Sequence, residues 1–163
     1  MKKIVALILV IITLSSCTVQ ENMSPAAFIE RLEEADDSVA ADTENAFFAQ
    51  GEYICRLSYG VADGFLLKIS ADSHSYTSKI CLVYSGSDGQ EDFVGCCKSI
   101  TEIYAPSEDV DTVASELFGK KEGFAFYESE RYLYAYYDNE ENIYFCIENR
   151  MLSEKTEAEL TLR

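Results

Sequence analysis

The chain has 163 residues with 29 acidic and 13 basic side chains, which gives a net charge of −16 at pH 7. A protein this acidic repels phosphate, so nucleic acid is excluded as an expected partner. The single histidine also excludes a histidine-rich metal site, and we expect no metal and no cofactor. The length corresponds to about one domain.

The first residues have the pattern of an export signal. Two lysines at positions 2 and 3 precede an apolar stretch over residues 4–14, and Ser15 and Ser16 follow it. As a helix this stretch rises about 16 Å, which is too short for a hydrocarbon core of about 30 Å. A cationic start, a short apolar region and small residues are typical of a secretory signal rather than a permanent membrane span.

The end of this stretch, Leu14-Ser15-Ser16-Cys17, resembles the lipobox of bacterial lipoproteins, in which an aliphatic residue and two small residues precede a cysteine. The resemblance covers only the first seventeen residues. It implies cleavage before Cys17 and a diacylglyceryl group on its thiol, and two acyl chains give stable anchoring. We therefore expect a chain held by this lipid at a bacterial cell membrane, facing the extracytoplasmic side.

The expected mature chain has 147 residues and a net charge of −18. After a signal peptide over residues 1–16, residues 17–24 comprise the lipidated cysteine and a short tether, and residues 25–163 form a single domain. Ser24 followed by Pro25 is typical of a helix start. The acidic stretch over residues 33–44 either extends this helix or forms a loop.

Alternating apolar residues predict six strands, and helical spacing predicts two more helices between the third and the fourth. The strands cover residues 53–59, 65–71, 79–84, 124–127, 132–137 and 143–148. The helices cover residues 91–104 and a segment from Ser107 that ends at Gly119. Leu160 and Leu162 alternate in the tail and are compatible with a final edge strand. Because strands follow one another through short turns, we expect a mainly antiparallel sheet with helices on one face, an α+β domain.

Alternate residues of a strand point to opposite faces of a sheet. We assign the more apolar set to the face under the helices: Phe65, Leu67, Ile69, Phe124, Phe126, Leu133, Ala135, Ile143, Phe145 and Ile147. We assign seven polar or aromatic side chains to the other face: Arg56, Lys68, Tyr127, Tyr132, Tyr134, Tyr136 and Tyr144. Tyrosine and arginine are enriched at interfaces, so these seven form the candidate ligand-binding surface. Alternatively, cross-strand tyrosines stabilise the sheet without binding a ligand.

Five cysteines remain once Cys17 is assigned to the lipid: Cys55, Cys81, Cys96, Cys97 and Cys146. Five thiols cannot all pair within one chain. Because several lie in apolar patterns, we expect mostly buried thiols. The alternative is at least one disulfide, which an extracytoplasmic compartment permits.

No catalytic pattern stands out. His74 lies in a polar loop, and the serine in SGSDG lacks the spacing of a nucleophile elbow. We therefore predict a non-catalytic binding module whose partner is a protein, peptide or glycan of the cell envelope. Two alternatives stay open: a structural or assembly accessory of the envelope, and a carboxylate-dependent hydrolase. The hydrolase requires two acids in one cleft, at least one with a raised pKa.

Overall fold

A computed structural model describes residues 23–86, 89–119, 123–139 and 141–152. The strands are β1 (Val39–Ala49), β2 (Glu52–Tyr59), β3 (Ala62–Ala71), β4 (Thr77–Tyr84), β5 (Phe124–Glu128), β6 (Tyr132–Asp138) and β7 (Ile143–Asn149). The helices are α2 (Pro25–Ala35), α3 (Gln90–Tyr104) and α4 (Val110–Phe118). The predicted signal peptide, Cys17 and the predicted strand around Leu160 lie outside the described residues.

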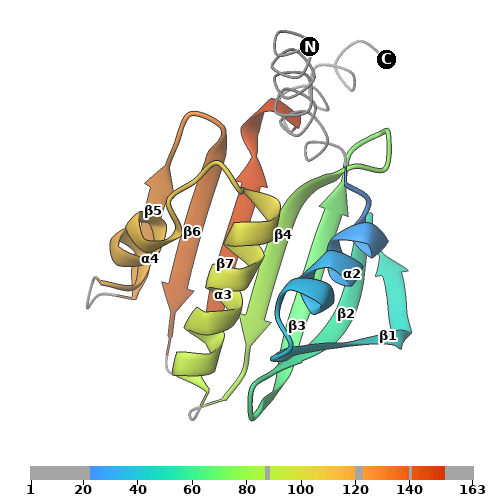
Figure 1. Ribbon diagram of the computed structural model, residues 1–163, viewed down its shortest axis with the longest axis horizontal. Helices are drawn as coiled ribbons and strands as arrows, with labels where there is room; N and C mark the ends of the chain where they lie inside the picture. Colours follow the sequence, from blue (N-terminus) through green and yellow to red (C-terminus); the bar gives the residue numbers. More distant parts are fainter. Residues whose placement is uncertain (1–22, 87–88, 120–122, 140, 153–163) are drawn as a thin grey trace, which may run out of the picture.

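The strands form one antiparallel sheet in the order β1-β2-β3-β4-β7-β6-β5. Three helices, α2, α3 and α4, lie on the same face of this sheet (Figure 1). The α+β prediction is therefore confirmed. Two meanders, β1–β4 and β5–β7, meet where β4 pairs with β7.

The first helix begins as the sequence predicts, but the segment after it does not follow the prediction. The Ser24 hydroxyl accepts a hydrogen bond from the Ala27 amide at 3.3 Å, and the helix ends at Ala35. The acidic stretch over residues 33–44 runs through the end of α2 and into β1, so neither a longer helix nor a loop describes it. Gln50 and Gly51 both have positive φ, which is the geometry of a tight hairpin turn between β1 and β2.

The end of the predicted tether belongs to the packed domain. Met23 is buried, and its carbonyl accepts a hydrogen bond from the Thr77 amide at 2.7 Å. Ser24 caps α2. Ser24 thus has the capping position that the Ser24-Pro25 pair predicts, and only Met23 departs from an extended tether.

The helix-covered face of the sheet holds the core. Phe65, Leu67, Phe145 and Ile147 are buried there, as predicted. α3 contributes Phe93, whose ring lies 6.2 Å from that of Phe65. Burial of such apolar surface is the main source of stability for a domain of this size.

On β5 and β6 the predicted faces are inverted. Tyr132, Tyr134 and Tyr136 are 5%, 0% and 6% exposed and belong to the core. The residues predicted to be buried, namely Phe124, Phe126, Leu133 and Ala135, point to the opposite face, where Phe124 and Phe126 are 60% exposed. The physical reason is packing against α4. The Tyr136 ring packs on Phe118 of α4, with the ring centroids 5.0 Å apart, and the small side chain of Ala125, directly opposite Tyr136 on β5, leaves room for this contact.

One disulfide joins the two meanders. Cys81 on β4 and Cys146 on β7 are directly opposite each other, with their Cα atoms 4.2 Å apart, and they form a disulfide. Cys55, Cys96 and Cys97 are free and buried. The alternative of at least one disulfide is therefore confirmed, and the expectation of buried thiols holds only for the other three cysteines.

Candidate functional site

The candidate site is the face of the sheet opposite the helices, which we call the open face. Its side chains are those of Ile54, Arg56, Leu66, Lys68, Lys79, Cys81, Val83, Phe124, Phe126, Leu133, Ala135, Tyr137, Tyr144, Cys146 and Glu148. All three described helices pack on the other face, so no described helix covers these side chains (Figure 1). Large exposed apolar areas on a sheet face are a mark of interaction surfaces.

Aromatic side chains gather at the β5–β7 end of the open face. Phe124 is opposite Tyr137, and Tyr137 is opposite Tyr144, so these three side chains form one row across three strands. The rings of Tyr137 and Tyr144 lie 6.0 Å apart, and those of Phe124 and Phe126 lie 6.3 Å apart. Tyr137 is 42% exposed and Tyr144 is 36% exposed. Aromatic side chains in this arrangement offer a wide, rigid contact area with polar tips.

Two cations lie toward the other end of the open face. Arg56 on β2 and Lys68 on β3 make no ion pair with any described residue. Arg56 also lines an open hollow of about 540 Å³ formed by residues of β1, β2 and β3. The residues around this hollow are Ala40, Ala41, Asp42, Arg56, Leu57, Ser58, Asp63 and Gly64. Unpaired cations beside apolar surface can pair with acidic or carbonyl groups of a partner.

The structure brings three of the seven predicted site residues together on the open face: Arg56, Lys68 and Tyr144. The other four, Tyr127, Tyr132, Tyr134 and Tyr136, lie on the covered face, so their prediction as binding residues is wrong. Tyr127 is partly buried against the core.

Sequence reasoning missed the exposed Phe124, Phe126 and Tyr137. Both alternating sets in β6 are aromatic or apolar, so the pattern alone carried no signal for which set faces the helices.

The buried thiols are unsuited to nucleophilic chemistry. Burial raises the pKa of Cys55 and of Cys96 to about 12, with smaller contributions from nearby acids. Burial also raises the pKa of Cys97, which the neighbouring Cys96 raises further. Because the thiolate is the reactive form, these cysteines act as core side chains.

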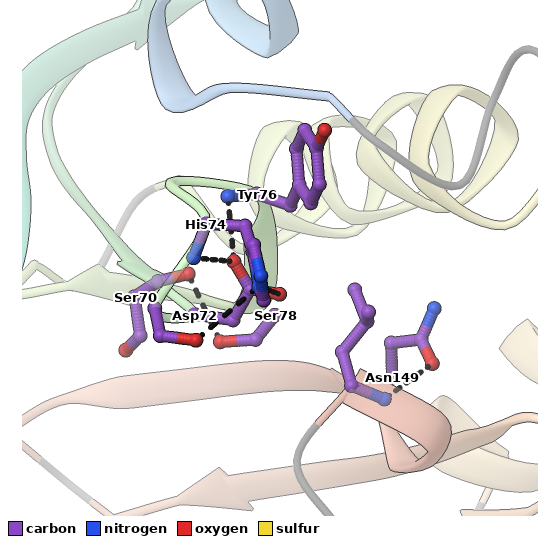
Figure 2. Close-up of polar contacts among 8 residues, drawn as sticks. Ser70, Asp72, His74, Tyr76, Ser78 and Asn149 are labelled. Carbon is purple, nitrogen blue, oxygen red and sulfur yellow. Dashed lines mark hydrogen bonds and ion pairs between the residues drawn. The ribbon is translucent and has the colours of Figure 1, made fainter. Parts of the chain in front are cut away.

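The loop that carries His74 is held by a buried carboxylate (Figure 2). Asp72 accepts hydrogen bonds from the backbone amides of His74 and Tyr76, both at 2.9 Å. On the neighbouring strand the Ser78 hydroxyl donates to the Ser70 carbonyl at 3.2 Å. The His74 ring is half-exposed and lies 3.8 Å from Asp72. These contacts shape the β3–β4 turn, which accounts for the polar residues of the loop.

The carboxyl groups provide no support for the hydrolase alternative in the described part of the chain. The pKa of Asp36 is lowered, chiefly because the Ser99 hydroxyl donates to it at 2.5 Å. A general acid requires a shift in the opposite direction. Within the described ranges no cluster of three His, Cys, Asp or Glu side chains has a geometry that could hold a metal ion.

Comparison of the chain with protein-family models, with curated proteins and with solved structures gave no match in any of the three. Among the described residues, no helix combines the length and the apolar character needed to cross a membrane.

Proposed function

We propose that this protein is a lipid-anchored, extracytoplasmic, non-catalytic binding module that holds a protein of the cell envelope against its open face. The observation that carries the proposal is the uncovered aromatic surface, where Phe124, Phe126, Tyr137 and Tyr144 are exposed on the face opposite all three described helices. An enzyme would instead be expected to present a concave site with perturbed titratable groups.

Two further observations support the location. The Leu14-Ser15-Ser16-Cys17 stretch resembles a lipobox, which implies a lipid on Cys17. The Cys81–Cys146 disulfide fits an oxidising compartment outside the cytoplasm. Because the domain is strongly acidic, anionic lipid headgroups do not attract it. The acyl chains therefore provide the membrane contact.

The location is tested by cell fractionation of the wild type and of Cys17→Ser. We expect the wild type in the membrane fraction and the variant in the soluble extracytoplasmic fraction. A variant that stays in the membrane fraction would contradict anchoring through this residue.

The binding surface is tested by photocrosslinking in intact cells. A photoreactive phenylalanine analogue replaces Tyr137 on the open face, and the same analogue at Phe48 serves as the control. Phe48 is 72% exposed but lies on β1, opposite Tyr53 on the other side of the sheet. We expect a defined protein adduct from position 137 and none from position 48. Identical adducts from both positions, or no adduct from position 137, would refute the proposed surface.

A further inference from the structure

The outer edge of β5 presents backbone groups as well as side chains. β5 is the last strand of the described sheet (Figure 1). The amide of Ser129 donates to the carbonyl of Tyr132, and the amide of Asp138 donates to the carbonyl of Gly123, so residues 123 and 129 face β6. Along a strand of an antiparallel pair, the backbone N–H and C=O groups of successive residues point alternately toward the neighbouring strand and away from it. The N–H and C=O groups of Phe124, Phe126 and Glu128 therefore point away from β6, toward the side on which no described strand lies.

The same residues direct their side chains onto the open face. Phe124 and Phe126 are each 60% exposed, and Glu128 follows them on that side. A strand added beside β5 would thus meet both a row of hydrogen-bonding groups and a pair of aromatic rings. This combination gives affinity through the main chain and selectivity through alternate side chains in strand-addition complexes.

The opposite edge of the sheet has the features that prevent such pairing. β1 carries a break in register between Asp42 and Phe47, and Glu44 lies inside it. Bulges and charged side chains are the usual protection of an edge strand. β5 pairs with β6 without a register shift and contains no proline, and its one charged residue, Glu128 at its end, is paired with Arg150. The two edges therefore differ in a way that leaves β5 open to pairing.

We propose that β5 receives an extended segment of the partner protein as an additional strand. The inference rests on the proposed function, since it names the mode of recognition and the class of partner for the same open face. The segment has apolar side chains at alternate positions, which lie over Phe124 and Phe126. It is cationic, because the chain as a whole has a net charge of −16. The same charge disfavours a second copy of this chain, which would be equally acidic.

A proline scan separates recognition of the backbone from recognition of the side chain. Phe126→Pro removes an outward N–H and no hydrogen bond to β6, so the sheet can keep its pairing. Phe126→Ala removes the ring but retains the N–H. The matched control is Phe48→Pro on β1. Phe48 is also exposed, and its backbone also points outward, because the tight turn makes Ala49 and Glu52 the hydrogen-bonded pair. Circular dichroism and thermal melting of each variant report whether it is folded.

The binding experiment uses a library of random ten-residue peptides displayed on phage, selected against the full-length protein in detergent. We expect enrichment of sequences with alternating apolar residues and at least one lysine or arginine. The best peptide should bind Phe126→Pro about tenfold or more weakly than wild type, and Phe48→Pro equally well. Methylating the amides of alternate peptide residues should abolish binding for one of the two alternating sets and not for the other. Enrichment of no sequence, or equal binding to wild type and to Phe126→Pro, would overturn the inference.

The failure of this inference differs from the failure of the proposed function. If Phe126→Pro binds the peptide as well as wild type but the crosslink from position 137 persists, the open face remains the binding surface. Only recognition by strand addition is then refuted. If the crosslink is absent too, the proposed function is refuted as well. Light scattering tests whether the strand added to β5 belongs to a second copy of this chain. A wild type that is dimeric and a Phe126→Pro variant that is monomeric would overturn the assignment of a different partner protein.

Discussion

Tyr136 and Tyr137 are neighbours on β6, yet their rings belong to different environments. The Tyr136 ring is 6% exposed and packs edge-on against Phe118 of α4 at 5.0 Å. The Tyr137 ring is 42% exposed and lies 6.0 Å from Tyr144 on the open face. One side of this sheet therefore uses aromatic residues to fill the core, while the other side leaves them exposed.

The largest expected effect comes from removing one ring from each face. Tyr134→Ala should lower the free energy of unfolding by about 3–5 kcal/mol, because it leaves a cavity in the core. Tyr137→Ala should lower it by less than about 1 kcal/mol, because the ring is largely in water. Chemical denaturation of both variants measures the difference. Equal losses would show that the two faces are not distinct in energy.

The disulfide is the strongest stabilising contribution expected from the open face. Cys81 and Cys146 are 65 residues apart, and a cross-link over such a loop stabilises by about 4 kcal/mol in the chain-entropy account. The double variant Cys81→Ala/Cys146→Ala should lose most of this stability in urea denaturation.

Cys55→Ala is the control for the disulfide variant, since it removes a buried thiol and no cross-link. It should cost about 1 kcal/mol, which is typical of a single substitution. A double variant no less stable than this control would contradict the expected contribution.

A smaller effect is expected on the covered face at high pH. Burial and, to a smaller extent, the Asp138 carboxylate together raise the pKa of Tyr136 from 10.0 to about 12. The folded state therefore keeps its proton more strongly than the unfolded chain, so this contribution is complete below pH 10 and is lost as the pH rises toward 12. Tyr136→Phe should flatten the fall in stability over that window, measured by denaturation at each pH. An unchanged slope would show that this hydroxyl does not contribute.

The smallest effect on stability is expected at Arg56. Since its guanidinium makes no ion pair with a described residue, Arg56→Gln should change the free energy of unfolding by less than about 0.5 kcal/mol. The same variant should reduce the crosslinking yield from position 137 if the partner extends across the sheet. A large loss of stability would show that Arg56 stabilises the fold and would contradict its assignment to the binding surface.

The class of fold was predictable because most elements have a clear periodicity. In β3 and β7 one alternating set consists of large apolar residues and the other is less apolar, and both the strands and their buried faces follow the prediction. In β6 the sequence YLYAYYD offers two apolar faces, so alternation alone could not choose between them. The choice is made by α4, which accommodates Ala125 and the ring of Tyr136.

Two other features needed tertiary information. β1 contains acidic residues and a register shift, so its pattern is not that of a regular strand, although Gly51 was a signal for a hairpin turn. The pairing of Cys81 with Cys146 depends on β7 inserting beside β4 instead of extending the sheet in chain order. The candidate site was therefore predicted on the correct face at Arg56, Lys68 and Tyr144, and on the wrong face at Tyr127 of β5 and at the three tyrosines of β6.

The order of strands also constrains when the sheet can be completed. A chain made from its amino terminus can assemble β1–β4 before the later strands exist, since these neighbours are connected by short turns. β7 is the last of the described strands to be synthesised, yet it occupies the centre of the sheet. Until it arrives, the outer side of β4 lacks β7 as its partner, and Cys81 is a free thiol in a chain whose Cys55, Cys96 and Cys97 are thiols as well. Oxidation before that moment would therefore trap a wrong pairing, so the timing of oxidation relative to the completion of the chain decides whether the native cross-link forms.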